Sequence, residues 1–215
     1  FGAMAIDDDG RPLWNTGLGH GDAMHVGDLD PSRPGLEVFK VSEDSSKPSS
    51  WFADARTGQV IWSTPPNGDN GRGVSGDIYA GSPGAESWSS RDGSLRSPTG
   101  AAIGRKPSST NFLVWWDADP VRELLDSTHI DKYGPNGDTR LLTGSGVTSV
   151  NGTKATPSLS GDILGDWREE VIWPTTDNRA LRIYASPYQT NVKIHTLLHD
   201  PQYRVAIAWQ NTAYN

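Results

Sequence analysis

The segment Asn151–Trp173, NGTKATPSLSGDILGDWREEVIW, carries two groups of side chains that could do chemistry. Lys154 follows an Asn-Gly turn, and an uncharged lysine amine can act as a general base. An acidic group follows it: Asp162, Asp166 and Glu170. Carboxylates on one loop are the oxygen ligands that Ca²⁺ prefers. Plainer interpretations stay open, since NGTK can be a hairpin turn with an exposed lysine and Asp often caps turns.

The acidic group recurs along the chain, which indicates an internal repeat. GDLDPSRPGLE (27–37) aligns without a gap on GDIYAGSPGAE (76–86), and residues 161–170 and 116–125 are shorter copies. Three copies offer a set of carboxylates for Ca²⁺: Asp28, Asp30 and Glu37; Asp162, Asp166 and Glu170; and Asp117, Asp119 and Glu123. The copy at 76–86 has Tyr79 in place of an aspartate, so we expect no ion there.

A second motif alternates with the acidic one. GRPLW (10–14) and GQVIW (58–62) each place a turn glycine four residues before a tryptophan. The two motifs alternate at about 40–50 residues, the length of a four-stranded propeller blade. A β-sandwich is less favoured because it needs no repeat of this length. We therefore predict an all-β chain that covers about four to five blades of a β-propeller.

Short apolar runs between Gly, Pro, Asn and Asp clusters define the expected strands. They are EVFKV, QVIWST, NFLVWW, EVIWP, LRIYAS and RVAIAW. Residues 119–130, DPVRELLDSTHI, could form a short helix or a pair of polar strands. Both ends of the sequence suggest a segment of one propeller domain spanning 1–215 and truncated at each end.

Composition excludes several classes of protein. The 215 residues include no cysteine and carry a formal charge of −7. Without a basic stripe we expect no nucleic-acid partner, and without an apolar run near 18 residues we expect no membrane partner. Nine tryptophans could stack on sugars, but core positions are the simpler expectation.

The segment that enters each repeat copy could contribute to one rim of the propeller. His20 and Asp22 precede the first copy, Arg72 the second and Lys154 the third. In an extended segment His20 and Asp22 point the same way, and Glu43 in the next loop could reach them. A hydrogen-bonded surface histidine is the plainer interpretation of His20. This pattern predicts a cleft with a cation site, an arginine and a lysine.

Six stretches together resemble rhamnogalacturonan lyases of polysaccharide lyase family 11. The resemblance implies an eight-bladed, calcium-bound propeller enzyme that is secreted and degrades pectin. It implies cleavage of the rhamnose–galacturonate backbone of rhamnogalacturonan I by β-elimination, with the remainder of the propeller needed to close the ring. The stretches are GHGDAMHVGDLDPSRPGLEVF, DARTGQVIW, GRGVSGDI, WWDADPVRELLD, NGTKATPSLSGDILGDWREEVIW and LRIYASPYQTNVKIHTLLHDPQYRVAIAWQNTAYN.

The resemblance also implies roles for individual residues. It implies calcium ligands in HGD and SED, namely His20, Asp22 and Glu43. It implies substrate contacts and catalytic groups in NGTK, GRG and NTAYN, which are Asn151, Gly152, Thr153, Lys154, Arg72, Asn211, Tyr214 and Asn215.

The implied elimination removes the C5 proton of a galacturonate and expels the sugar at C4. Ca²⁺ or Arg72 would neutralise the neighbouring carboxylate and so acidify that proton. Lys154 is the expected base, and Tyr214 the expected acid or positioning group. The alternative is a non-catalytic, calcium-stabilised propeller that binds glycans or proteins. A hydrolase is less favoured, because no single pair of carboxylates stands out.

Overall fold

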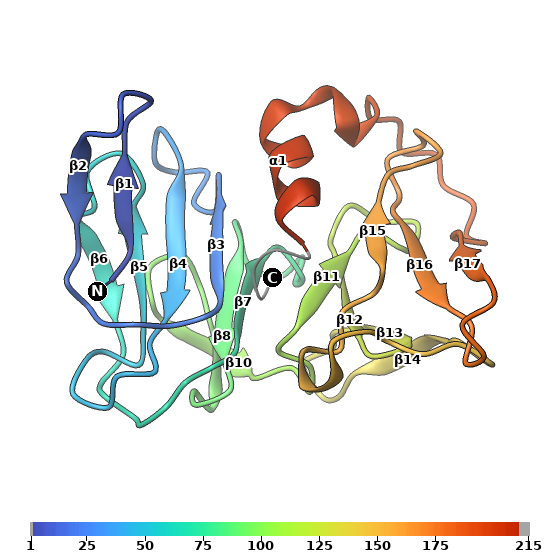
Figure 1. Cartoon of the computed structure of the whole chain (residues 1–215), viewed down its shortest axis with the longest axis horizontal. Coiled ribbons are helices and arrows are strands. Elements are labelled where there is room, and N and C mark those ends of the chain that lie inside the picture. Colours follow the sequence, from blue (N-terminus) through green and yellow to red (C-terminus); the bar gives the residue numbers. More distant parts are fainter. Residues whose placement is uncertain (1, 211–215) are drawn as a thin grey trace. The chain divides into compact units, whose positions relative to one another are not determined.

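The computed structural model describes residues 2–210, and its regular elements are almost all short antiparallel strands (Figure 1). It divides into two compact units: unit 1, residues 1–110, and unit 2, residues 111–215. In every described sheet the strands pair in the order of the sequence, which is the meander topology of a propeller blade. The predicted all-β, β-propeller class is confirmed.

Unit 1 contains a two-stranded sheet and two four-stranded sheets among its described residues. The two-stranded sheet pairs β1 (Met4–Ile6) with β2 (Pro12–Asn15). The first four-stranded sheet is β3 (Met24–Gly27), β4 (Glu37–Val41), β5 (Ser50–Asp54) and β6 (Val60–Ser63). The second is β7 (Gly73–Gly76), β8 (Glu86–Ser89), β9 (Ser94–Arg96) and β10 (Ala102–Arg105).

Unit 2 contains a four-stranded and a three-stranded sheet, followed by a helix. The four-stranded sheet is β11 (Phe112–Val114), β12 (Glu123–Asp126), β13 (His129–Lys132) and β14 (Thr139–Thr143). The three-stranded sheet is β15 (Leu159–Gly161), β16 (Glu170–Pro174) and β17 (Leu181–Tyr184). Two 3₁₀ turns, η1 (Gly152–Lys154) and η2 (Leu197–His199), and one α-helix, α1 (Pro201–Trp209), complete the described part.

The strand predicted for RVAIAW is wrong, because these residues lie in helix α1. Asp200 precedes the helix and its carboxylate accepts hydrogen bonds from the N–H groups of Gln202 and Tyr203, as an N-cap does. Pro201 occupies the first turn, where its missing N–H costs nothing. Residues 119–130, for which a helix was one possibility, form the hairpin of β12 and β13. The other five predicted runs contain strands. No helix of the described residues is long and apolar enough to cross a membrane.

The repeated acidic motif has one structural role in all four of its copies. A glutamate at the start of the second strand of each of the four larger sheets is almost fully buried. One of its carboxylate oxygens, Oε2, accepts hydrogen bonds from two consecutive N–H groups of the loop that leaves the first strand. The pairs are Glu37 with Leu29 and Asp30, Glu86 with Ile78 and Tyr79, Glu123 with Trp116 and Asp117, and Glu170 with Ile163 and Leu164.

The second repeated motif connects neighbouring sheets within unit 1. Trp14 on β2 lies over Gly58 in the β5–β6 turn, and its indole N–H donates to the Ala55 carbonyl oxygen at 3.1 Å. Trp62 on β6 lies in the same way over Gly100 in the β9–β10 turn and donates to the Pro98 carbonyl oxygen at 2.8 Å. Each motif therefore supplies an outer-strand indole to the turn of the following sheet.

Tryptophan side chains are prominent among the buried residues of both units. Trp51 and Trp88 in unit 1 and Trp116, Trp167 and Trp173 in unit 2 are almost fully buried. In unit 2, Trp116 and Trp173 belong to one apolar cluster that joins β11, β12 and β13 to β16. These five side chains are core residues, as expected for most of the tryptophans.

Candidate active site

The first candidate cation site lies in unit 1, where the chain enters β3 and leaves β4. His20 Nε2 is 3.0 Å from Glu43 Oε2 and 3.4 Å from Asp22 Oδ1. The ligand atoms of these three residues all lie within 4.8 Å of one another. The imidazole is exposed, whereas the two carboxylates are mostly buried. The structure thus brings together His20, Asp22 and Glu43, as the sequence predicted.

Backbone and side-chain hydrogen bonds hold the two loops of this site side by side. The Glu43 N–H donates to the His20 carbonyl oxygen at 2.8 Å. The Ser42 hydroxyl lies 3.2 Å from the Leu18 carbonyl oxygen and 3.3 Å from that of His20. The buried Lys40 ammonium donates to the carbonyl oxygens of Gly21 and Val41. The segment bearing His20 and Asp22 is therefore fixed against the end of β4.

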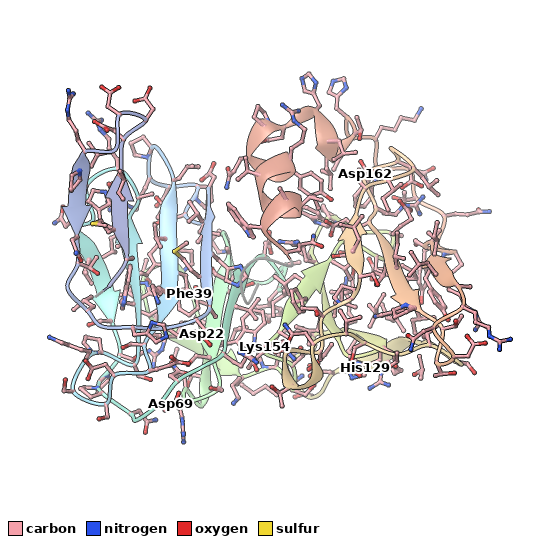
Figure 2. The ribbon with its side chains drawn as sticks, in the orientation of Figure 1. Asp22, Phe39, Asp69, His129, Lys154 and Asp162 are labelled. Carbon is pink, nitrogen blue, oxygen red and sulfur yellow. The ribbon has the colours of Figure 1, made fainter. Side chains whose placement is uncertain are left out.

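The electrostatics of this site favour binding of a positive charge. Burial raises the pKa of Glu43, and the nearby carboxylate of Asp22 raises it further. Asp69, in the loop between β6 and β7, adds a third negative charge (Asp22 and Asp69 are labelled in Figure 2). Burial lowers the pKa of Lys40, although Asp22 and Glu43 oppose that shift. A cation between the carboxylates would relieve their mutual repulsion.

The donor set fits a calcium ion in part. Asp22 and Glu43 supply the hard carboxylate oxygens that Ca²⁺ requires, and Asp69 is close enough to act electrostatically. The imidazole of His20 is a softer ligand than Ca²⁺ usually takes. Ca²⁺ with these residues stays a prediction. Asp69 was missed in the sequence because NGDNGRG carries no signal beyond that of a turn.

Arg72 lies next to this site in the segment that enters β7. A Cβ built on the preceding Gly71 would lie 3.3 Å from Glu43 Oε1. The half-buried Arg72 guanidinium donates to the Gly71 carbonyl oxygen at 2.8 Å. Unit 1 therefore places the backbone leading into Arg72 against the carboxylate of Glu43. The shared cleft predicted for Arg72 and Lys154 stays a prediction, because they belong to different units.

In unit 2 the NGTK segment is a tight 3₁₀ turn rather than a simple hairpin turn. Asn151, Gly152 and Ala155 all have left-handed backbone, with φ of 60°, 49° and 53°. Alanine adopts this region rarely, and strained backbone of this kind clusters at functional sites. An isolated bridge between Val150 and Thr156 closes the loop at its base. The loop therefore holds a defined but strained shape (Lys154 is labelled in Figure 2).

Burial changes sharply along this loop. Asn151, Gly152 and Thr153 are exposed, Lys154 is half-buried, and Ala155 to Pro157 are buried. The three predicted substrate-binding residues are thus accessible, and the lysine lies at the boundary between solvent and core. Asn211, Tyr214 and Asn215 lie outside the described residues.

The two other predicted calcium sets, in the loops after β3 and β15, contain aspartates that cap turns and carboxylates that are buried. Asp30 accepts hydrogen bonds from the Ser32 N–H and hydroxyl, and Asp166 pairs with Arg168, so these aspartates stabilise their own loops. Asp162 and Glu37, in contrast, are fully buried. Asp162 Oδ1 and Glu37 Oε1 accept no hydrogen bond from the described residues, which fits a cation as partner.

Neither of these sets meets the geometry of the His20 site. The sets Asp28–Asp30–Glu37 and Asp162–Asp166–Glu170 are not among the described groups whose ligand atoms lie within 4.8 Å of one another. Both calcium sets stay predictions. The repeat copy with Tyr79, for which no ion was expected, also contains a buried carboxylate oxygen without a hydrogen bond. This oxygen is Glu86 Oε1, which accepts no hydrogen bond from the described residues.

In the remaining copy a lysine side chain occupies the centre of the acidic group. Lys132 Nζ lies 2.8 Å from a carboxylate oxygen of each of Asp117, Asp119 and Glu123. Although burial opposes it, the hydrogen bonds to these carboxylates raise the pKa of Lys132, which keeps it charged. An ammonium therefore stands where the sequence offered a calcium site. Lys132 was missed because it follows the motif on the next strand.

Comparisons with known proteins agree over the whole chain. A family model described as rhamnogalacturonan lyase family 11, C-terminal domain, matches residues 1–215. The chain is 55% identical over 219 residues to rhamnogalacturonan endolyase YesW of Bacillus subtilis, and 49% identical over 234 residues to rhamnogalacturonan exolyase YesX of the same organism. It covers 35% and 38% of these relatives, so it spans little more than a third of their length.

Solved structures show the same fold. The crystal structure of rhamnogalacturonan lyase YesW at 1.40 Å resolution matches all of this chain with a TM-score of 0.96 and 53% identity, over 37% of its own length. A rhamnogalacturonan lyase PL11 of Bacillus licheniformis matches with a TM-score of 0.95 and 55% identity, also over 37% of its length.

Proposed function

The chain belongs to rhamnogalacturonan lyase family 11, and from this membership we propose that it takes part in the β-elimination of rhamnogalacturonan I. The proposed substrate is the rhamnose–galacturonate backbone of this pectin. Relatives named as endolyase and as exolyase are both similar to the chain, so the proposal covers either mode of cleavage. Action outside the cell, on plant cell-wall pectin, is part of the proposal.

Family membership carries this proposal, and the shape of the NGTK loop supports the role given to Lys154. A half-buried lysine follows three exposed residues in a strained turn that a backbone bridge closes. The left-handed backbone of Ala155, which caps this turn, costs about 1–2 kcal/mol. We attribute this strain to positioning of the Lys154 amine towards a bound sugar.

In the proposed reaction Lys154 accepts the C5 proton of a galacturonate as its C4–O bond breaks. The C–H electron pair becomes the C4–C5 double bond, and the departing rhamnosyl oxygen takes a proton from Tyr214. Arg72 pairs with the galacturonate carboxylate and stabilises the charge that develops on it. Asn151, Thr153, Asn211 and Asn215 bind sugar hydroxyl groups, and the Gly152 backbone allows close approach.

The proposed cofactor is Ca²⁺, held by His20, Asp22 and Glu43. When bound, it would neutralise the substrate carboxylate and acidify the C5 proton. Further ions at the buried carboxylates of Glu37 and Asp162 would stabilise their loops. A Ca²⁺ ion bound at the His20 site would add two positive charges there, which is how an acidic chain could attract a polyanionic substrate.

Replacement of Lys154 tests the base role most simply. Lys154→Ala in the intact protein should lower kcat by a factor of about 100 or more, since general-base catalysis contributes about 10²–10⁴. Thr153→Ala is the matched control in the same loop and should change mainly KM. The rate is measured as the rise in ultraviolet absorbance from unsaturated uronate ends. A Lys154→Ala variant with near-normal kcat would remove Lys154 from the mechanism.

A further inference from the structure

Unit 1 has an open cavity that is lined by the loop between β6 and β7 and by the turn between β8 and β9. Its volume is about 210 Å³. Sites for drug-sized ligands occupy about 300–1,000 Å³, so this cavity suits a group no larger than one sugar unit. Its walls are formed mainly by Ser49, Pro65, Pro66, Asn67, Arg91 and Arg96.

Arg91 is the exposed cation of this cavity, and two hydrogen bonds fix its position. Its Nε donates to the Asp69 carbonyl oxygen at 2.7 Å, and its own carbonyl oxygen accepts from Asn67 Nδ2 at 2.8 Å. The terminal nitrogens, Nη1 and Nη2, have no acceptor among the described residues. The end of the guanidinium therefore offers the paired N–H groups that match a carboxylate.

The second arginine of the cavity is already neutralised. Arg96 donates through Nε and Nη2 to the two carboxylate oxygens of Asp92, and through Nη1 to the Gly100 carbonyl oxygen at 2.9 Å. Asp92 also accepts from the Ser94 N–H at 3.1 Å. Arg91 is thus the cation of the cavity whose charge no described carboxylate balances.

A hydroxyl group and an apolar wall complete the cavity. Ser49 is only 4% exposed, and its hydroxyl oxygen accepts from Asn70 Nδ2 at 3.0 Å. The Ser49 O–H donates to no described residue, and because a hydroxyl hydrogen can rotate, it is available to a ligand. Pro65 and Pro66 provide apolar surface that the C–H face of a sugar ring can cover.

The segment around the cavity is basic although the chain as a whole is acidic. Residues 88–110 contain four basic residues and one acidic residue, whereas the chain has a formal charge of −7. Lys106 Nζ donates to the Ser90 carbonyl oxygen at 3.2 Å, so a second cation lies on the turn that bears Arg91. A local positive potential of this kind attracts a polyanion.

Asp69 connects the cavity to the candidate cation site of unit 1 (Asp69 is labelled in Figure 2). Its carbonyl oxygen accepts from Arg91, whereas its carboxylate adds negative charge at Glu43. The Ser42 N–H donates to the Ser49 carbonyl oxygen at 2.9 Å, so the loop that begins at Glu43 ends at the wall of the cavity. An oligosaccharide at the cation site can therefore extend to the cavity within one unit.

We propose that this cavity is a further uronate-binding site, in which Nη1 and Nη2 of Arg91 bind the carboxylate of a galacturonate that lies outside the bond being cleaved. The Ser49 hydroxyl donates to the same sugar. This inference rests on the proposed function for the identity of the sugar, since galacturonate is the acidic unit of the proposed substrate. Because the contact is the same before and during the reaction, it lowers KM and leaves kcat unchanged.

Protection of arginine side chains from phenylglyoxal, an arginine-selective reagent, tests the site in the intact protein. The probe is trigalacturonate, which contains no rhamnose–galacturonate bond. With saturating probe the rate of Arg91 modification, followed by peptide mass spectrometry, should fall by a factor of about five or more. The rate at Arg56, which is exposed in the β5–β6 turn, should not change.

The methyl ester of trigalacturonate, at the same ionic strength, separates recognition of the carboxylate from recognition of the sugar hydroxyl groups. It should protect neither arginine. Unchanged modification of Arg91 with trigalacturonate, or equal protection by the methyl ester, would overturn the proposed site.

Kinetics of Arg91→Gln on rhamnogalacturonan test the role of the site in the reaction. The variant should raise KM about tenfold with kcat unchanged, because it loses a charge-assisted contact that is equally strong in the ground state and the transition state. Arg56→Gln makes the same change in net charge and should keep the wild-type KM. A wild-type KM in Arg91→Gln, or a lower kcat without a change in KM, would contradict the proposal.

The protection experiment also separates this proposal from the proposed function, because it requires no cleavage. Protection of Arg91 in a protein that forms no unsaturated products would overturn the proposed function and leave the uronate site established. Cleavage of rhamnogalacturonan without protection of Arg91 would overturn the site and leave the proposed function standing.

Discussion

Replacement of Gly100 by alanine tests how the repeated Gly–Trp motif joins neighbouring sheets. Gly100 has φ of +84° and lies under Trp62, and a Cβ there would be 2.7 Å from Trp62 Cγ. Gly10 has almost the same backbone, with φ of +81°, but a Cβ there would meet nothing within 4 Å. The two glycines therefore differ in packing and not in backbone conformation, so Gly10→Ala is a matched control.

The expected losses in the free energy of unfolding follow from this difference in packing. Alanine in left-handed backbone costs about 1–2 kcal/mol at either position. At Gly100 the contact with Trp62 adds about 1–3 kcal/mol, which is typical of overpacking. Gly100→Ala should thus lower the free energy of unfolding by about 2–5 kcal/mol, and Gly10→Ala by about 1–2 kcal/mol. The effect on the unfolded chain is the same for both and cancels in the comparison.

Urea unfolding of the intact protein measures both variants, with the free energy taken from the midpoint and the slope. Combining Gly100→Ala with Trp62→Ala should reveal a coupling energy of about 1–3 kcal/mol, because the clash is removed with the indole. Equal losses for Gly100→Ala and Gly10→Ala, or additive effects of Gly100→Ala and Trp62→Ala, would refute the packing role assigned to the motif.

Two further predictions concern buried carboxylates. Lys132→Ala should lower the free energy of unfolding by about 3–5 kcal/mol, because it leaves the buried Glu123 without its cation, while alanine at the exposed Lys193 should have little effect. Added CaCl₂ should restore part of the stability of Lys132→Ala, and a variant as stable as wild type would contradict the role of the lysine. Burial raises the pKa of Glu86 to about 7 from an ordinary value of 4.5. The contribution of protonated Glu86 to the free energy of unfolding is therefore fully present below pH 4.5 and is lost as the pH rises through about 7. The free energy of unfolding of Glu86→Gln should therefore match that of the wild type at pH 4 and exceed it by up to about 3 kcal/mol at pH 8. Thermal unfolding curves of the two proteins that differ equally at both pH values would argue against the raised pKa.

Local repeats made most of the fold predictable. The Gly-Asp motif and the glutamate that follows it mark a loop and the start of the next strand, as Gly27 and Glu37 show by pairing in register. The run QVIWST, which contains Trp62, was predicted correctly as a strand and contains β6. The partners of the Trp14 and Trp62 indoles, Gly58 and Gly100, were not predicted, because they lie in the following sheet and far along the sequence.

The main error in the fold came from weighing apolar periodicity above a capping signal. RVAIAW alternates well enough for a strand, but Asp200 and Pro201 directly precede this region and are typical of a helix start. Docking of Tyr203 and Ile207 on β15 then stabilises the helix. Tertiary contacts of this kind cannot be read from a local pattern.

The candidate site shows the same limit. Spacing predicted the pairing of His20 with Asp22, and the next loop supplied Glu43. Lys132 could not be found this way, because only the fold brings its ammonium to the carboxylates of the preceding loop. The sequence therefore identified acidic loops but not which of them a lysine already neutralises.

The mass of the products formed from rhamnogalacturonan I in ¹⁸O-labelled water tests the central claim most directly. Elimination forms a C4–C5 double bond and takes no oxygen from water, whereas hydrolysis adds one labelled oxygen for each bond cleaved. The proposed lyase function predicts ultraviolet-absorbing oligosaccharides without ¹⁸O, and a large loss of these products in Lys154→Ala. Labelled, saturated products, or no products with Ca²⁺ present, would contradict it.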